Sequence, residues 1–354
     1  MSGSQDSSSA LDRAPGPRRV VSVAVIGVGR MGTLHAELLA RSIDGARLAA
    51  VHDTARERAA SVGELLGVPS AASVEELIEA PDIDAVAICS STDTHAELVE
   101  RAAGAGKAVF CEKPLSLDLA TTEALAAAVE QAGVVCQIGF NRRFDPSHAA
   151  VQAAVESGEL GAPHLIRITS RDPEPPPVEY VRVSGGLFLD MSSHDFDMAR
   201  FTCGSEVVEV FARGSARVDP TLADRGDVDT ALLSLVHANG CLTSIDNSRR
   251  ASYGYDQRVE AFGPRGMACS GNHDRHSARV LTGSGGSSPT LQRFFLDRYQ
   301  ESYTRAWEAF VAAIAERQPP PVGIPDARAA LAIGLAARRS MAERRPVPVD
   351  EMRA

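Results

Sequence analysis

The sequence predicts an α/β protein in two parts: an N-terminal doubly wound parallel sheet, and a C-terminal α+β domain with a large, mostly antiparallel sheet. Three observations carry this prediction. Up to about residue 140, short apolar segments alternate with helical ones, which is typical of parallel strands buried on both faces. A glycine-rich turn follows the first apolar segment. Beyond residue 163 the strands become longer, and Asn239-Gly240 between two of them indicates a hairpin.

The N-terminal elements are expected to alternate with short joints between them. Two helices begin with the spacing of a capping box, Ser73 to Glu76 and Thr94 to Glu97. The expected strands are residues 19–28, 47–53, 85–89, 107–111 and 134–139. The expected helices are 33–42, 55–66, a short one from 73, 94–105 and 118–131. This order predicts a Rossmann-type sheet.

The C-terminal part begins with a helix at Asp145-Pro146, because Asp is a favoured N-cap and Pro fits the first helical position. The expected strands are 164–171, 207–218, 229–238, 241–249 and 258–262. The helices that follow the first are 186–201, 297–316 and 326–342. Residues 283–289 are predicted to form a flexible loop, Trp307 to lie in the core, and Arg249-Arg250 to be a solvated strand end.

Composition limits the partners and the location. Lys and Arg number 36 and Asp and Glu 46, and the resulting net charge of −10 disfavours nucleic acid as a partner. No apolar run reaches the roughly 18 residues of a membrane span, and no signal peptide is recognisable. The six cysteines lack metal-ligand spacing, and His273 and His276 have no third ligand nearby. We therefore expect free thiols in a cytoplasmic protein, and no metal.

The first glycine-rich turn has the G-x-G-x-x-G pattern, with Gly27, Gly29 and Gly32. It follows a buried strand and opens a helix, whose free N–H groups can hold a pyrophosphate. Asp53 follows Gly32 by 21 residues at the end of the next strand, where a carboxylate accepts ribose hydroxyls and repels a 2′-phosphate. The pattern therefore predicts NAD; FAD and a purely structural turn are the alternatives. The expected cofactor-binding residues are Gly27, Gly29, Arg30, Met31, Gly32, Asp53, Ser91 and Glu112.

Three further residues are candidates for the chemistry. Lys113, before Pro114, follows a strand whose carboxyl end lies at the ligand crevice of such a sheet, although a solvated lysine is the alternative. Asp190 and His194 are spaced i, i+4 and would share one helix face, so that the carboxylate could orient a histidine base. A capping Asp and a packed His are the alternative for that pair, and the constellation with Lys113 favours catalysis.

Together these segments resemble the glucose–fructose oxidoreductase / inositol dehydrogenase family, from about residue 20 to 349. The resemblance is carried by the glycine motif, by residues 105–115 with Glu112-Lys113-Pro114, and by Asp190 and His194. Segments 137–145, 252–256 and 293–303 look most like those of inositol 2-dehydrogenases. The resemblance implies that Lys113, Asp190 and His194 are catalytic and that Arg142 and Tyr255 contact a polyol. We expect Asp172 to hold ring hydroxyls together with these two residues. Ser170-Arg171-Asp172, where such enzymes tend to have His-Arg-Asn, and the proline-rich residues 173–177 depart from the pattern.

These observations predict an NAD-dependent dehydrogenase of a cyclic polyol, most simply myo-inositol oxidised to the 2-inosose. Another sugar or polyol dehydrogenase, a non-catalytic NAD and sugar sensor, and a two-sugar oxidoreductase are the alternatives. The expected organisation is a disordered tail (1–18), a dinucleotide-binding domain (19–140) and a substrate-binding and oligomerisation domain (141–354). The C-terminal helices of the last domain could pack back on the first. A large sheet with few helices to cover it predicts a homodimer or homotetramer.

Overall fold

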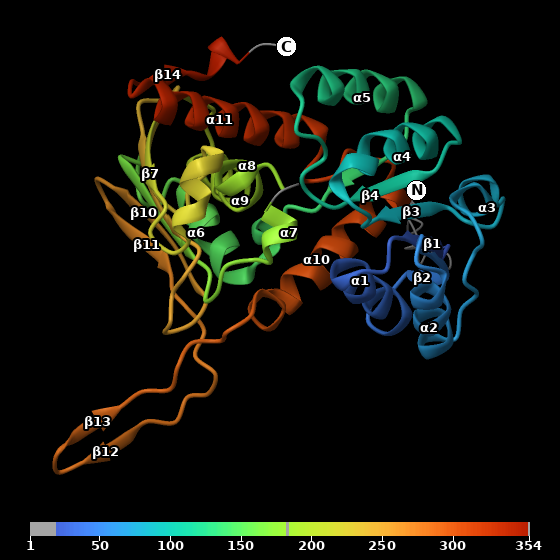
Figure 1. Ribbon diagram of the computed structural model, residues 1–354, viewed down its shortest axis with the longest axis horizontal. Helices are drawn as coiled ribbons and strands as arrows, with labels where there is room; N and C mark the ends of the chain where they lie inside the picture. The colour runs from blue at the N-terminus through green and yellow to red at the C-terminus, as the bar shows by residue number, and fades with distance from the viewer. Residues whose placement is uncertain (1–18, 182–183, 353–354) are drawn as a thin grey trace, which may run out of the picture.

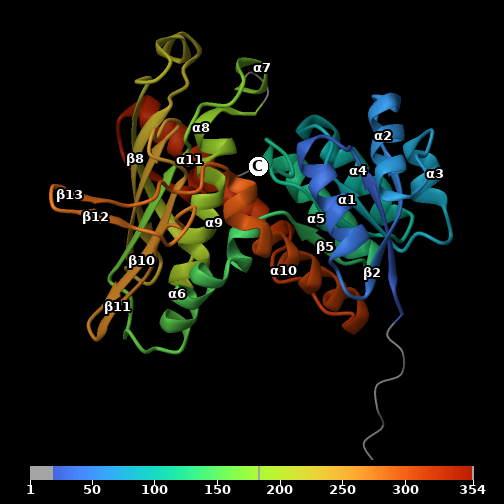
Figure 2. The same cartoon turned by 90° about the horizontal axis from the view of Figure 1, so that it is seen from below.

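The computed structural model describes residues 19–181 and 184–352, so the predicted tail lies outside the described residues. Two α/β halves lie side by side (Figures 1 and 2), and the helix α10 (Phe295–Glu316) runs between them. The predicted fold class is confirmed: a parallel sheet forms the first half and a larger mixed sheet forms the second.

The first sheet has five parallel strands in the order β2-β1-β3-β4-β5. The strands are β1 (Val21–Ile26), β2 (Ala46–His52), β3 (Ala85–Ile88), β4 (Ala108–Cys111) and β5 (Cys136–Ile138). The helices between them are α1 (Arg30–Arg41), α2 (Arg56–Leu66), α3 (Val74–Glu79), α4 (Thr92–Gly104) and α5 (Leu119–Ala132). Every residue of β1, β3 and β4 is buried, as their apolar composition requires of strands covered on both faces.

Two helix starts test the predicted capping boxes. Ser73 does cap α3, because its side chain accepts a hydrogen bond from the Glu76 N–H. The box at Thr94 is wrong: α4 begins two residues earlier, at Thr92, with Ser91 as its N-cap. The Thr94 hydroxyl instead donates to the Ser91 carbonyl within the first turn. Ser91 therefore lies in the short joint between β3 and α4.

The second sheet has seven strands in the order β11-β10-β6-β9-β8-β7-β14. They are β6 (Leu165–Arg171), β7 (Val207–Ser215), β8 (Thr230–His237), β9 (Leu242–Ser248), β10 (Asp256–Gly263), β11 (Gly266–Ser270) and β14 (Val347–Pro348). Only β6 and β9 pair in parallel among these strands, so the mostly antiparallel prediction is confirmed. The short strands β11 and β14, at the two edges, were not predicted.

Helices cover one face of this sheet, on the side toward the first half (Figure 2). They are α6 (Pro146–Glu156), α8 (Gly186–Asp190), α9 (Ser192–Cys203) and α11 (Ile324–Glu343). The remaining short helices are α7 (Val178–Val181) and the 3-10 turns at Asn141–Phe144, Pro220–Arg225 and Val349–Glu351. The other face exposes a row of apolar side chains from neighbouring strands: Leu165, Leu242, Phe262 and Met267. Leu232 of β8 is exposed on the same face, outside this row.

The segment predicted as a flexible loop is a hairpin instead. Strands β12 (Val280–Thr282) and β13 (Gly285–Ser287) pair around a two-residue turn. The hairpin projects far from the body of the molecule (Figure 1), with Leu281 82% exposed near its tip. The serines and glycines that suggested flexibility here form the turn and the second strand.

The helix α10 packs back on the first half, as the sequence allowed. Trp307 is fully buried and stacks on Phe110 of β4 with ring centroids 4.5 Å apart. Its indole N–H donates a 2.9 Å hydrogen bond to His35 of α1. Helix α10 therefore covers one side of the parallel sheet. Within the described part of the chain, no helix is long and apolar enough to cross a membrane.

Candidate active site

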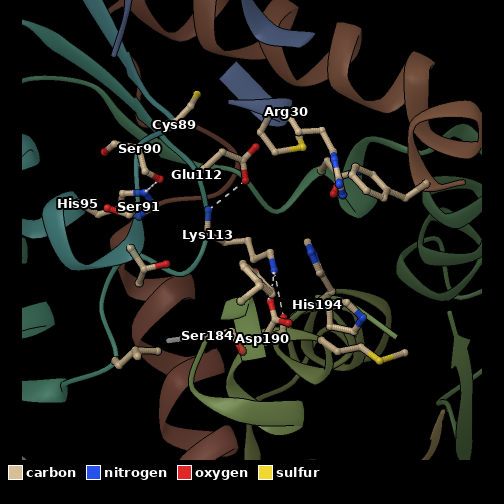
Figure 3. Close-up of a pocket in the computed structure, with 18 of the residues that line it drawn as sticks. Arg30, Cys89, Ser90, Ser91, His95, Glu112, Lys113, Ser184, Asp190 and His194 are labelled. Carbon is tan, nitrogen blue, oxygen red and sulfur yellow. Dashed lines mark hydrogen bonds and ion pairs between the residues drawn. The ribbon is translucent and has the colours of Figure 1, made fainter. Parts of the chain in front are cut away.

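A cavity of about 1210 Å³ lies between the two halves, at the carboxyl ends of β3 and β4. Side chains from both halves converge on it (Figure 3). Ten of the predicted residues line it: Arg30, Met31, Ser91, Glu112, Lys113, Arg142, Asp172, Asp190, His194 and Tyr255. The four others, Gly27, Gly29, Gly32 and Asp53, form the turn and strand end beside it and are not part of its lining.

The three glycines of the motif differ in what prevents a side chain. Gly27 has φ +86°, and a Cβ there would lie 2.6 Å from the Ser90 backbone. A Cβ on Gly32 would lie 1.7 Å from the Gly27 carbonyl oxygen. Gly29 has no neighbouring atom within 4 Å of where its Cβ would be. The protein itself therefore requires Gly27 and Gly32, whereas Gly29 leaves open space at the start of α1.

Asp53 is locked to the glycine turn by backbone hydrogen bonds. Its two carboxylate oxygens accept from the Val28 N–H at 2.9 Å and from the Ala55 N–H at 2.8 Å. Arg58 reaches the same carboxylate at 3.4 Å. The carboxylate thus stands at the end of β2, directly beside the start of α1, where the sequence placed it.

Glu112 is held by a hydrogen-bonded chain that crosses three elements. Trp307 donates to His35 Nδ1, which places the ring proton on Nε2, and His35 Nε2 then donates to Glu112 at 2.8 Å. The other Glu112 oxygen accepts from the Lys113 backbone N–H at 3.2 Å. A Cβ on Gly139 would lie 2.8 Å from the same carboxylate, so that side chain fills the space beside β5. The backbone before the lysine is therefore fixed.

Lys113 forms an ion pair with Asp190 across the cavity (Figure 3). Its ammonium donates to the Asp190 carboxylate at 3.2 Å and to the Asp190 carbonyl oxygen at 3.1 Å. Burial lowers the pKa of Lys113, but the neighbouring Asp190 and Tyr180 more than offset this effect and leave the pKa above its usual value. Lys113 is consequently a stable cation. It is also largely buried, so the alternative of a solvated surface lysine is wrong.

Two residues that were not predicted as part of the site also contact Asp190. The Tyr180 hydroxyl donates to it at 2.8 Å, and Arg249 Nη2 donates at 3.2 Å. The prediction that Arg249 is a solvated strand end is wrong, because Arg249 is 2% exposed and lines the cavity. Burial raises the pKa of Asp190, but Lys113 and Arg249 reverse the effect and hold it below its usual value. The only signal that could have predicted Arg249 here is that an acid buried beside a lysine, as Asp190 is, can be stabilised by a further cation.

His194 lies one turn beyond Asp190, but the two side chains do not bond. The helix is broken into α8 and α9 at Met191, which keeps right-handed helical angles, so both side chains still face the cavity. The expected orientation of His194 by Asp190 is wrong, because the carboxylate is drawn to Lys113 and Arg249 instead.

The His194 ring is positioned by packing rather than by a polar partner. Its Nδ1 is buried without a hydrogen-bond partner among the described residues, and its ring meets Phe140 edge to face with centroids 5.8 Å apart. Burial, with help from the cations Lys113 and Arg142, lowers its pKa well below 6.5. His194 is therefore neutral throughout the physiological range, and a neutral imidazole can accept a proton.

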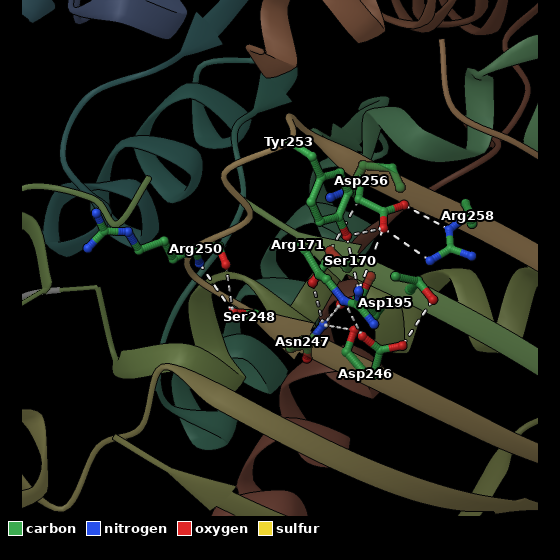
Figure 4. A network of polar contacts seen from close by, with 12 residues as sticks. Ser170, Arg171, Asp195, Asp246, Asn247, Ser248, Arg250, Tyr253, Asp256 and Arg258 are labelled. Atoms are coloured by element: carbon green, nitrogen blue, oxygen red, sulfur yellow. Dashed lines mark hydrogen bonds and ion pairs between the residues drawn. The ribbon is translucent and has the colours of Figure 1, made fainter. Parts of the chain in front are cut away.

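Arg142 and its partners form the wall on the other side. Arg142 donates to Asp195 at 2.6 Å and to Ser170 at 3.3 Å. Asn247 donates to the second Asp195 oxygen at 2.8 Å (Figure 4). Arg142 therefore lines the cavity while its guanidinium is paired with the buried Asp195 carboxylate.

Two predicted residues of this wall keep free polar groups. Tyr255 is buried against Tyr299, edge to face at 6.0 Å. Among the described residues, none donates a hydrogen bond to the Asp172 carboxylate, which lines the cavity after β6. Burial raises the pKa of Asp172 to about 6, against the opposing effect of Arg249 and Arg142. Asp172 thus offers two acceptor oxygens to whatever enters.

Comparison with known families and proteins places both halves. Residues 21–140 match the model described as "Oxidoreductase family, NAD-binding Rossmann fold", and residues 148–269 match the "GFO/IDH/MocA C-terminal domain". A myo-inositol 2-dehydrogenase of Thermotoga maritima is 49% identical over 93% of this chain and 99% of its own length. An inositol 2-dehydrogenase of Rhizobium meliloti is 43% identical over 93% and 99%.

Solved structures give the same likeness. A putative myo-inositol dehydrogenase from Sinorhizobium meliloti superposes with a TM-score of 0.90 at 42% identity, over 93% of this chain and 99% of that one. A scyllo-inositol dehydrogenase from Lactobacillus casei, solved with NAD(H) and scyllo-inositol, gives 0.87 at 29% identity, over 94% and 100%. Both halves and their connection are therefore shared with these proteins.

Proposed function

The chain belongs to the GFO/IDH/MocA oxidoreductase family, and from this premise we propose that it is an NAD-dependent inositol 2-dehydrogenase that oxidises myo-inositol to the 2-inosose. One observation carries the proposal: a protonated lysine and a neutral histidine face one cavity at the carboxyl end of the parallel sheet. That pair supplies a hydrogen-bond donor and a proton acceptor to one secondary alcohol.

The glycine turn suits NAD. Gly29 leaves open space where the free N–H groups of α1 begin, and a pyrophosphate would fill that space. Asp53, Arg30, Met31, Ser91 and Glu112 would hold the rest of the dinucleotide. When bound, NAD supplies the acceptor for the carbinol hydride.

The chain's own residues handle the proton and the developing charge. Neutral His194 takes the hydroxyl proton of the substrate. Lys113 donates a hydrogen bond to the oxygen as it becomes an alkoxide, and its positive charge stabilises that oxygen. Asp190 keeps Lys113 protonated and fixes the direction of its side chain. Arg142, Asp172 and Tyr255 would hold the other ring hydroxyls, and Asp172 can accept two of them.

A spectrophotometric panel tests the proposal. Purified enzyme is assayed with myo-inositol, scyllo-inositol and aldoses, each with NAD and NADP, by following the absorbance of the reduced nicotinamide. We expect the highest kcat/KM with myo-inositol and NAD. A preference for scyllo-inositol or an aldose would support the alternative polyol dehydrogenase. Binding without turnover of any of them would support the sensor.

We also propose a domain boundary near residue 140, a cytoplasmic location and a homo-oligomer, tetramer or dimer. Six unpaired cysteines, all within the described residues, favour a reducing compartment. The apolar row of Leu165, Leu242, Phe262 and Met267 on the open sheet face favours a second copy packed against it. Light scattering at micromolar concentration tests this assembly, and a monomer would contradict it.

A further inference from the structure

Arg249 and Arg250 are neighbours in the sequence but have opposite environments. Arg249 is buried, and its Nη2 donates to Asp190. Arg250 is exposed, and its side chain extends away from the sheet (Figure 4). Arginine burial is costly unless the charge is paired, and Asp190 supplies that pairing inside the cavity.

The Asp190 carboxylate is saturated by three donors from three separate elements. Lys113 follows β4, Tyr180 lies on α7, and Arg249 follows β9. Lys113 and Tyr180 share the Oδ1 atom, whereas Arg249 takes Oδ2. Oδ2 of Asp190 could therefore accept a hydrogen bond from another group only if Arg249 were removed.

Resting on the proposed function, we propose that Arg249 is a positioning residue of the reaction. It holds Oδ2 of Asp190, keeps the carboxylate ionised and turned toward Lys113, and so fixes the ammonium that meets the developing alkoxide. His194 is left as the acceptor of the substrate proton because Asp190 is occupied.

The charges around Asp190 support this assignment. The cations Lys113 and Arg249 flank the carboxylate, Tyr180 donates to it, and the neighbouring acid Asp172 repels it. Without Arg249, one anion would face one cation in a buried site, with Asp172 adding repulsion. Such a carboxylate takes up a proton more readily, and a protonated Asp190 no longer holds Lys113.

Two more titratable groups act on the lysine side of this pair. Glu112 stabilises the charged form of Lys113 from the cofactor side of the cavity. His194 faces the same lysine and stays neutral because it is buried beside cations. Both groups are present in every arginine variant, so the variants differ in the partners of Asp190.

The first experiment compares Arg249→Met with Arg250→Met, which changes the adjacent arginine outside the cavity. We expect Arg249→Met to lower kcat/KM for the inositol by about tenfold to a hundredfold, the usual scale for groups that orient functional side chains. Arg250→Met is expected to match the unmodified enzyme. Arg249→Lys keeps the charge and should recover part of the loss. Equal rates in Arg249→Met and Arg250→Met would overturn the proposal.

The pH profile separates positioning from a general structural role. Loss of Arg249 should move the acid limb of kcat/KM upward by about one pH unit, because Asp190 loses a neighbouring cation. The comparison is repeated in an Asp172→Asn background, which removes a neighbouring carboxylate that could titrate. A lower rate with an unmoved acid limb would mean that Arg249 only supports the fold.

A second experiment does not depend on activity. Lys107 and Lys113 are the only lysines in the sequence, so selective ¹³Cε-lysine labelling gives two protein signals. The Lys113 signal should follow ionisation of Asp190 in the acid range, while Lys107, which donates to the Ala80 and Ile83 carbonyls, should stay still. In Arg249→Met this transition should shift to higher pH, and in Arg250→Met it should not.

The two experiments keep the proposals apart. If the unmodified enzyme turns over none of the inositols, the proposed function fails, yet the lysine signal still decides what Arg249 does to Asp190. If the enzyme is active and the transition is the same in both arginine variants, the proposed function stands and the assignment of Arg249 is wrong. Arg249→Gln, which also removes the charge and adds no lysine signal, serves for both measurements if Arg249→Met does not fold.

Discussion

The two sides of the cavity are built by different means. On the cofactor side, Gly27, Gly32 and Asp53 are fixed by the main chain: neighbouring backbone leaves no room for a Cβ on either glycine, and two N–H groups hold the carboxylate. On the substrate side, Lys113 and Asp190 hold each other through ionised side chains that come from opposite halves of the chain.

The difference teaches what each side tolerates. A site made of backbone depends on the absence of side chains, so an added methyl group damages it, whereas a change of charge alters the choice of cofactor more than the turnover. A site made of buried charges depends on the balance among them, so removal of one member unsettles the others. Substitutions on each side can therefore break or sharpen this contrast.

The largest effect is expected from the substrate side. His194→Ala and Lys113→Ala should each lower kcat by roughly two to four orders of magnitude, the scale for a general base or an oxyanion donor. NAD affinity, measured by fluorescence quenching, should hardly change in His194→Ala, since that residue comes from the other half. More than a tenth of kcat remaining in His194→Ala would show that another group takes the proton.

The glycines offer a matched pair on the cofactor side. Gly32→Ala should lower the free energy of unfolding by at least about 2 kcal/mol, because its Cβ would overlap the Gly27 carbonyl oxygen. Gly29→Ala should change that free energy by no more than about 0.5 kcal/mol. It should nevertheless weaken NAD binding about tenfold, by filling the open space. Thermal melts and calorimetric titration measure the two effects, and normal NAD affinity in Gly29→Ala would contradict the assigned cradle.

Asp53 tests the one predicted charge at the end of β2. We expect NAD to be preferred over NADP by at least about tenfold in kcat/KM, which is about 1.4 kcal/mol and modest for repulsion of a 2′-phosphate. Asp53→Asn should narrow that ratio while leaving kcat with NAD nearly unchanged. Equal kcat/KM values for the two cofactors in the unmodified enzyme would refute the role of the carboxylate.

The smallest effect concerns pH and the free carboxylate of the substrate side. Asp172 has a pKa of about 6, so it is ionised above that pH and loses acceptor strength as pH falls through it. KM for the inositol should therefore rise about fourfold from about pH 7.5 to about pH 5.5, the ratio of the ionised fractions. Asp172→Asn should remove this dependence. A KM that varies with pH to the same extent in that variant would assign the titration elsewhere.

The glycine turn and its strands were accessible to sequence reasoning because their causes are local. A buried strand, a tight turn and a helix start are adjacent in the chain. The spacing of Gly27, Gly32 and Asp53 therefore predicts their positions relative to one another. Lys113 was found through the same local context at the end of β4. The hairpin at residues 280–287 was not predicted, because its short, exposed strands do not show the apolar pattern of a buried strand.

The substrate side shows the limit of local patterns. The i, i+4 spacing of Asp190 and His194 correctly predicted that both line the cavity. It could not predict which residues would donate hydrogen bonds to the Asp190 carboxylate. Two adjacent arginines looked alike in the sequence, and only Arg249 of the two is buried.

The sequence by itself determined the fold class, the glycine turn with its acid, and the identity of the lysine and histidine that meet in the cavity. These depend on the polarity and spacing of residues within single strand–helix units. Only the tertiary structure decided that Asp190 binds Lys113, Tyr180 and Arg249 rather than His194. The physical reason is that buried charges pair by proximity in space, and the fold brings residues at the ends of β4 and β9 and on α7 together at Asp190 of α8.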